Sequence, residues 1–164
     1  MKSDIKTISK EPFIDLDFKK LEKDNIKIIY NQTFRQRSKY YFYQTAFDFL
    51  SSNEIKGDYL EFGCHKARTF SFALREAYIK KINMSFYAFD SFEGLPDHKN
   101  NAKQNVHFLP KLLSTSKKEF LSLISKLIKK RKVEIVKGFY EDVLNFKLLR
   151  RFKKENLQAS FYMY

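Results

Sequence analysis

The chain has 164 residues, of which 43% are hydrophobic and 17% are aromatic. This composition supports one folded domain of ordinary size and excludes a disordered polymer. The low counts of 4 Gly and 3 Pro exclude collagen-like and low-complexity classes. With Cys64 as the one cysteine, no disulfide is expected within the chain, which fits the cytoplasm. No secretory segment is visible, and no apolar run approaches the roughly 20 residues that span a membrane.

The net charge is +13, from 32 basic and 19 acidic residues, and such an excess is typical of proteins that bind nucleic acid. Much of it is local, because residues 117–155 hold 13 basic and 5 acidic residues, a net charge of +8. Apolar residues recur among these cations at helical spacing, which favours solvated helix faces over a binding patch. A nucleic-acid partner is therefore not favoured and is kept as an alternative.

Residues 1–56 are predicted to form an N-terminal arm followed by an aromatic-rich helix. The first 25 residues are charged, with sparse apolar positions, and are typical of an arm or a short helix. The segment FRQRSKYYFYQTAFDFL (34–50) carries a stripe of apolar residues at helical spacing.

From residue 57 onwards, short apolar runs alternate with amphipathic segments. Strands are expected over 58–62, 85–89, 133–136 and 159–164. Helices are expected over 69–81, after a Ser116-x-x-Glu119 capping box, and along one amphipathic segment from Val143 to Phe152. Apolar strands separated by helices are typical of a parallel sheet buried on both faces. The predicted fold class is therefore α/β and Rossmann-like, with about four strands.

The last run, ASFYMY (159–164), is typical of a buried strand, and no covering segment follows it. We therefore expect residues 57–164 to be the N-terminal half of a larger cofactor-binding domain. In a complete sheet of this class the strand at 159–164 is expected to be central.

Ligands of open α/β sheets bind at the carboxyl ends of the strands, so these ends hold the candidate site residues. In GDYLEFGCHKARTF (57–70), Glu61 lies at the end of the strand and Gly63 lets the backbone turn close to a ligand. The following helix begins with free backbone N–H groups. Against the dinucleotide pattern G-x-G-x-x-G only Gly63 is in place, so a dinucleotide fingerprint is weakly supported.

The second strand end, FYAFDSFEGLP (86–96), places Asp90 27 residues after Gly63. An acid at this position can accept hydrogen bonds from both hydroxyls of a ribose. A plain strand-to-loop turn also uses Asp and Gly, but the two strand ends together favour a bound nucleoside.

The third strand end, VEIVKGFYEDVL (133–144), offers Gly138 for close approach and Phe139 or Tyr140 for stacking on a purine. Core packing explains these aromatic residues equally well. The three histidines share no metal-ligand spacing, and Cys64 is more often a small buried hydrophobe than a reactive thiol.

In order and spacing, the strings GDYLEFGCHKARTF, YAFDSFEGLP and VKGFYEDVL resemble the S-adenosylmethionine-dependent macrocin and mycinamicin O-methyltransferase family, which are class I methyltransferases. The string DSFEGLP (90–96) is the most specific part, and EFG (61–63) and KGFYED (137–142) support it. The resemblance covers about residues 57–164, and Ala67 departs from the glycine that is usual in the family.

The resemblance implies that S-adenosyl-L-methionine binds across the first two strand ends. It places Glu61 and Gly63 on the methionine side, Asp90 at the ribose hydroxyls, and Ser91 and Phe92 beside the adenine. The cofactor-binding residues that it implies are Glu61, Gly63, Cys64, Asp90, Ser91, Phe92, Gly138 and Phe139.

The implied reaction is methyl transfer to a hydroxyl of a sugar or natural-product-like small molecule. Magnesium is expected for the family, but its acidic motif would follow the fourth strand, beyond Tyr164, so no metal ligand and no catalytic base are assigned. The leading interpretation is the N-terminal part of an O-methyltransferase, inactive as given and compatible with a homo-oligomer. The alternatives are a nucleic-acid-binding or RNA-modifying module that uses the basic helices at 117–155, and a degenerate, non-catalytic cofactor-binding protein.

Overall fold

The computed structural model describes residues 26–96 and 114–163, with side chains over 34–96 and 114–160. The helix predicted over 34–50 is confirmed and is longer, because α2 runs over Ile26–Ser52. The chain divides into two compact units at a boundary between Ala46 and Phe47, inside α2. The expected arm over residues 1–25 lies outside the described residues.

The second unit contains a parallel sheet, which confirms the α/β prediction. Its strands are β1 (Asp58–Phe62), β2 (Phe86–Asp90), β3 (Val133–Lys137) and β4 (Ala159–Met163). Their order is β3-β2-β1-β4, and every neighbouring pair is parallel. Phe62 pairs with Phe89. Gly63 and Asp90, which follow these two residues, therefore lie side by side at the carboxyl ends of β1 and β2.

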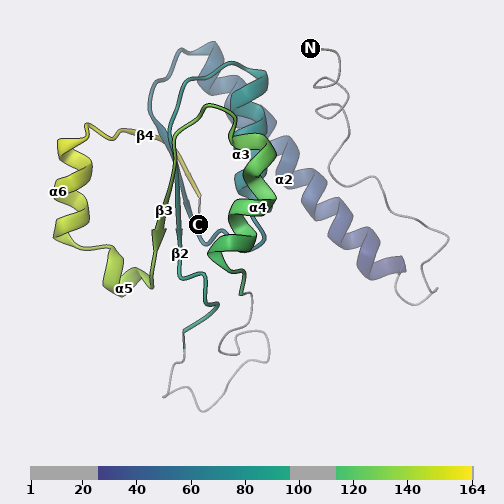
Figure 1. Ribbon diagram of the computed structural model, residues 1–164. Coiled ribbons are helices and arrows are strands. Elements are labelled where there is room, and N and C mark those ends of the chain that lie inside the picture. The colour runs from purple at the N-terminus through teal and green to yellow at the C-terminus, as the bar shows by residue number, and fades with distance from the viewer. Residues whose placement is uncertain (1–25, 97–113, 164) are drawn as a thin grey trace. The chain divides into compact units, whose positions relative to one another are not determined.

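Helices flank both faces of this sheet, with α3 (Arg68–Ile79) and α4 (Lys117–Ile128) on one and α5 (Tyr140–Val143) and α6 (Phe146–Lys154) on the other (Figure 1). The capping box is confirmed, because the Ser116 hydroxyl accepts a hydrogen bond from the Glu119 N–H at 3.2 Å. The prediction of one amphipathic segment from Val143 is wrong. Asn145 interrupts it and caps α6 by accepting from the Leu148 N–H at 3.1 Å.

The core is largely aromatic and is built from alternate strand positions. On the α3 and α4 face, the rings of Tyr59, Phe70 and Phe86 lie within 5.8 Å of one another, centroid to centroid. On the other face, Tyr87 packs edge-on against Phe152 of α6 at 5.3 Å. Such pairs contribute about 0.5–1.5 kcal/mol each beyond area burial. The first four residues of β2 are buried, whereas β3 is half-buried because it forms an edge of the described sheet.

The entry to β1 requires a glycine. Gly57 has φ +150°, and a Cβ there would lie 2.6 Å from the Gln158 carbonyl oxygen and 2.8 Å from Ser160 Cβ. Ser160 belongs to β4, so the missing side chain of Gly57 lets β4 pair closely with β1. Among the helices of the described residues, none has an apolar stretch long enough to span a bilayer.

Candidate functional site

Asp90, the last residue of β2, holds the loop that follows β1. Its Oδ2 accepts hydrogen bonds from the backbone N–H groups of Cys64 at 2.7 Å and His65 at 3.1 Å. Its Oδ1 accepts from the Phe92 N–H at 2.8 Å. One carboxylate thus organises the loops after both strands, and it retains acceptor capacity because a carboxylate has about four lone-pair positions.

The β1–α3 loop adopts left-handed backbone at several positions. Gly63 has φ +84°, and a Cβ there would lie 3.5 Å from the Tyr140 hydroxyl oxygen. Ala67, immediately before α3, has φ +56° and ψ +19°, a conformation that costs a non-glycine residue about 1–2 kcal/mol. The loop therefore uses left-handed, glycine-like backbone at a position that this chain fills with Ala67.

Glu61 is buried beneath this loop, with 2% of its surface exposed. The Tyr59 hydroxyl donates a short hydrogen bond to its Oε2, and the Thr69 hydroxyl donates to its Oε1 at 2.9 Å. Because Thr69 lies in the first turn of α3, the Glu61 carboxylate joins β1 to the start of that helix. The two donors hold the carboxylate in one orientation.

Cys64 is a buried thiol rather than a reactive one. Its Sγ lies 3.6 Å from the Glu61 carbonyl oxygen, and 2% of the residue is exposed. Burial raises the pKa of this thiol above its ordinary value, and the negative charges of Glu61 and Asp90 raise it further. The thiolate needed for nucleophilic chemistry is therefore disfavoured.

The carboxyl ends of β1, β2 and β3 surround a pocket of about 260 Å³, near the lower end of the range for small-molecule sites. It is lined by Gly63, His65, Asp90, Ser91, Gly94, Leu95, Pro96, Gly138, Phe139, Tyr140 and Glu141. Two carboxylates and no Lys or Arg are among these described residues, although the whole chain carries +13. The pocket is thus suited to a ligand with positive charge.

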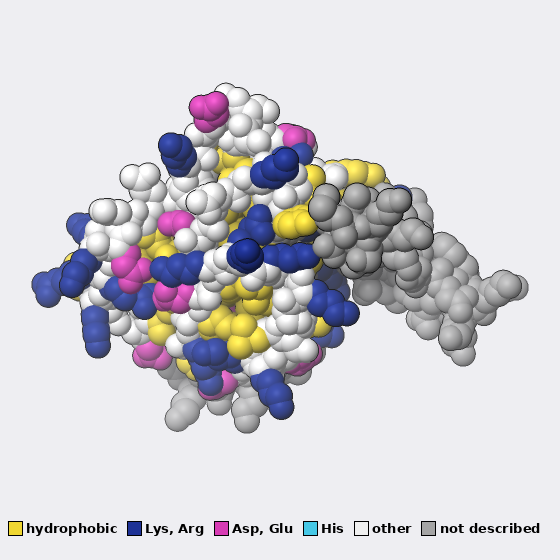
Figure 2. All heavy atoms as spheres, turned by 45° about the horizontal axis from the view of Figure 1, so that its top comes forward, with side chains coloured by type: hydrophobic (Ala, Val, Ile, Leu, Met, Phe, Trp, Pro, Cys, Tyr) yellow, Lys and Arg dark blue, Asp and Glu magenta, His cyan; other side chains and the backbone are white. Residues whose placement is uncertain are grey.

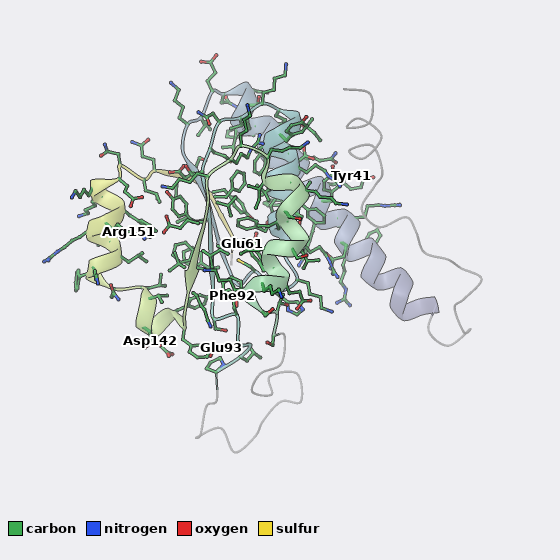
Figure 3. The ribbon with its side chains drawn as sticks, viewed as in Figure 1. Tyr41, Glu61, Phe92, Glu93, Asp142 and Arg151 are labelled. Carbon is green, nitrogen blue, oxygen red and sulfur yellow. The ribbon has the colours of Figure 1, made fainter. Side chains whose placement is uncertain are left out.

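The structure brings Gly63, Asp90, Ser91, Gly138 and Phe139 together around this pocket. It places the side chains of Glu61 and Phe92 on the side of the sheet that carries α3 and α4 (Figure 3), through their contacts with Thr69 and Phe120. The Phe92 ring is buried against Phe120 of α4 at 5.4 Å, so its side chain does not line the pocket. The side chains of Glu61 and Cys64 lie beneath the loop and do not line the pocket either.

Six lining residues are absent from the predicted set and follow the same strand ends: His65, Gly94, Leu95, Pro96, Tyr140 and Glu141. His65, which shares no metal-ligand spacing with the other histidines, has its Nδ1 3.2 Å from the Oγ1 of buried Thr115, just before α4. Leu95 and Glu141 also line the pocket. Their positions directly after strand ends were a signal that could have identified them.

Tyr140 extends over the β1–α3 loop from the start of α5. Its ring meets Phe62 edge-on at 6.1 Å. Burial raises the pKa of Tyr140 to about 12, with further contributions from the negative charges of Asp90 and Glu61. The phenol is therefore a neutral hydrogen-bond donor at physiological pH, in a pocket whose surroundings are negative.

No group of three or more His, Cys, Asp or Glu side chains within residues 26–96 and 114–163 is arranged to hold a metal ion. His98 and His107 lie outside these ranges. The described residues therefore do not fit a divalent metal, and none of the chemistry below passes through one.

A parallel sheet with helices on both faces (Figure 1) and a ligand-sized pocket at the carboxyl ends of β1 and β2 defines a Rossmann-like class of fold. The family model of TylF, macrocin-O-methyltransferase, matches residues 3–162. The chain therefore belongs to the TylF macrocin-O-methyltransferase family.

Solved structures agree with this fold. The chain is similar to the O-methyltransferase NovP, with a TM-score of 0.54 and 17% identity, over 68% of this chain and 48% of that one. It is also similar to CalS11, a calicheamicin methyltransferase, with a TM-score of 0.60 and 13% identity, over 99% of this chain and 65% of that one. The chain thus spans about half of the first structure and just under two thirds of the second. The comparison with curated proteins gives no match.

Proposed function

We propose that this chain forms the cofactor-binding part of an O-methyltransferase that uses S-adenosyl-L-methionine and methylates a hydroxyl of a small molecule. The observation that carries the proposal is the charge of the pocket at the strand ends. It presents Asp90 and Glu141 and no Lys or Arg among its described lining residues. Family membership and the methyltransferase fold of the similar structures support the same activity.

The charge of the pocket separates this cofactor from a dinucleotide. S-adenosylmethionine carries a sulfonium, an ammonium and a carboxylate group, and its net positive charge is favoured by negative surroundings. A pyrophosphate is favoured by cations and by free N–H groups at a helix N-terminus, but the first N–H groups of this loop, those of Cys64 and His65, donate to Asp90. The residues present therefore fit a cationic nucleoside better than a dinucleotide.

Within this proposal each residue has a distinct task. Asp90 accepts from a ribose hydroxyl at the one acceptor position that its three backbone donors leave. Gly63 leaves space beside the Tyr140 hydroxyl in the pocket, and Gly138 lets the chain pass close to Val143 as α5 begins. The backbone beside Ser91 and Phe92 borders the adenine. Glu61 acts from beneath the loop, where its charge favours the cationic methionine portion.

When bound, the cofactor supplies a methyl group on positively charged sulfur, and alignment with an attacking hydroxyl accounts for much of the rate enhancement in such reactions. The contribution of this chain is to orient the nucleoside through Asp90 and the glycine-containing loops. Tyr140 restricts access to Gly63 from the α5 side. We assign no catalytic base among the described residues, and the magnesium expected from the family stays a prediction.

Nucleic-acid modification, the principal alternative, would require Lys or Arg side chains near the carboxyl ends of the strands, where the cofactor is proposed to bind. The cationic residues 129–132 instead precede β3, at the opposite end of the sheet. The acceptor is accordingly proposed to be a small molecule such as a sugar or natural-product hydroxyl, and the protein a cytoplasmic one.

The activity is tested with the complete protein that contains this chain, using S-adenosylmethionine labelled on its methyl group and a panel of glycosides and phenols. Transfer of label to an acceptor oxygen, with stoichiometric S-adenosylhomocysteine, is expected. Transfer to RNA, or to no acceptor while the cofactor binds, would contradict the proposed reaction. Absence of cofactor binding would contradict the proposed site itself.

A further inference from the structure

A second hollow lies at the amino end of the sheet, on the opposite side from the candidate methyl-donor site. It is formed by the end of α3, the loop before β2 and the loop before β3, and its volume is about 700 Å³. It is lined by Tyr78, Lys81, Ile82, Asn83, Met84, Ser85, Lys129, Lys130, Arg131 and Lys132. Figure 2, which brings the top of Figure 1 forward, shows Lys and Arg side chains gathered beside apolar surface on this face.

The lining contains five cations and no acid among the described residues. Two of the cations converge on one aromatic ring, with Lys129 Nζ at 5.2 Å and Arg131 Cζ at 5.7 Å from the Tyr78 centroid. Lys132 lies 3.4 Å from Glu155 Oε2. This acid lies outside the lining and offsets part of the charge of the hollow.

Helix dipoles give an ordinary explanation for cations at this place, because α3 and α4 both end here. A helix C-terminus is equivalent to about half a negative charge. Two such ends offset about one of the five cations, which leaves a substantial positive excess. The dipoles therefore explain the presence of some Lys or Arg, but not of five around one hollow.

Arg131 supports a site that needs an anion. Its Nε is buried and has no hydrogen-bond partner among the described residues, although buried polar groups are normally paired. Burial also lowers the pKa of this guanidinium. Phosphate oxygens are strong acceptors for Arg and Lys donors, so a phosphate at this position would compensate the charge.

We propose that this hollow binds a compact ligand that carries several phosphates. The cations surround a concavity of small-molecule size rather than forming an extended track, so a compact anion fits better than a nucleic-acid strand. Two kinds of ligand carry such a polyphosphate group, namely an inorganic polyphosphate and a nucleoside triphosphate. Tyr78, which is 37% exposed, and the neighbouring half-buried Ile82 offer apolar surface for the base of the nucleoside triphosphate.

Calorimetry at physiological ionic strength with sodium tripolyphosphate, ATP and a single-stranded RNA oligomer tests this proposal on the full chain. The variant Lys129→Gln/Lys130→Gln removes two exposed cations of the hollow, and Lys153→Gln/Lys154→Gln removes two exposed cations of α6 as a matched control. We expect one tripolyphosphate per chain, with about tenfold or greater weakening in the first variant and little change in the second. Affinity for S-adenosylhomocysteine should be the same in both variants.

The two ligand sources are distinguished by comparing ATP with tripolyphosphate. Tighter binding of ATP, lost in Tyr78→Ala, identifies a nucleotide, whereas equal binding identifies the polyphosphate group alone. The proposal is overturned if tripolyphosphate does not bind or if both double variants weaken it equally. It is also overturned if RNA binds more tightly than tripolyphosphate, because an extended polymer would then be the ligand.

Discussion

Asp90 Oδ2 accepts a hydrogen bond from the backbone N–H of Cys64 at 2.7 Å, across the boundary between two neighbouring parallel strands. The carboxylate that sequence reasoning assigned to a ribose also holds the loop that surrounds the ligand. Binding and loop geometry are therefore coupled through one side chain. Changes at Asp90 should affect both cofactor affinity and the order of the β1–α3 loop.

Replacement of Asp90 by alanine should weaken S-adenosylmethionine binding by about tenfold or more, because hydrogen bonds to a charged group contribute about 1.5–3 kcal/mol each. Calorimetry on the complete protein measures the effect. Glu93→Gln is the matched control, because Glu93 lies three residues away, pairs with Lys137 at 2.9 Å and does not line the pocket. Equal affinities for the wild type and Asp90→Ala would refute the assignment.

Replacement of Gly63 by alanine should destabilise the fold by about 1–2 kcal/mol, because φ is +84° at this position. The added methyl would also lie next to the Tyr140 hydroxyl, inside the lining of the pocket, so cofactor affinity should fall. Urea denaturation and calorimetry measure the two effects. Ala67→Gly changes the same loop towards the residue that its left-handed backbone favours and should leave affinity intact. Loss of affinity in both variants would contradict this account.

The sequence predicted the sheet well, because its signals are local. The apolar runs around Phe86 and Val133 and the Ser116 capping box each specify their own element. The break at Asn145 was missed because the apolar spacing of α5 and α6 continues across it. In the site, Asp90 and Gly63 follow from the rule that ligands bind at strand ends. The burial of Phe92 depends on Phe120, 28 residues later in the chain, and no local pattern reports such a contact.

Removal of the Tyr59 hydroxyl should reduce the free energy of unfolding by about 1–3 kcal/mol. In Tyr59→Phe the buried Glu61 carboxylate loses the donor to its Oε2 and keeps the Thr69 hydroxyl. Urea denaturation monitored by circular dichroism measures the change. Tyr41→Phe, at a residue that is 52% exposed, is the control and should change stability by less than about 0.5 kcal/mol. Similar stabilities for the two variants would show that the buried hydrogen bond is not needed.

Cys64 should resist alkylation by iodoacetamide in the native protein, at pH values where the unfolded chain reacts readily. Its folded pKa lies above the ordinary value of 9.0. Stability should accordingly fall as the pH rises above about 9, because the unfolded chain loses this proton while the folded chain keeps it. Cys64→Ala should remove that part of the slope. Rapid native alkylation at neutral pH would show that the thiol is neither buried nor protonated as described.

The central claim is that the negative pocket at the ends of β1 and β2 selects a cationic nucleoside over a dinucleotide. Calorimetry of the complete protein with S-adenosylmethionine and with NAD⁺, under identical conditions, tests it most directly. The account predicts one S-adenosylmethionine per chain, with affinity lowered in Asp90→Ala, and no detectable NAD⁺ binding. Binding of NAD⁺ with an affinity equal to or greater than that for S-adenosylmethionine would contradict it.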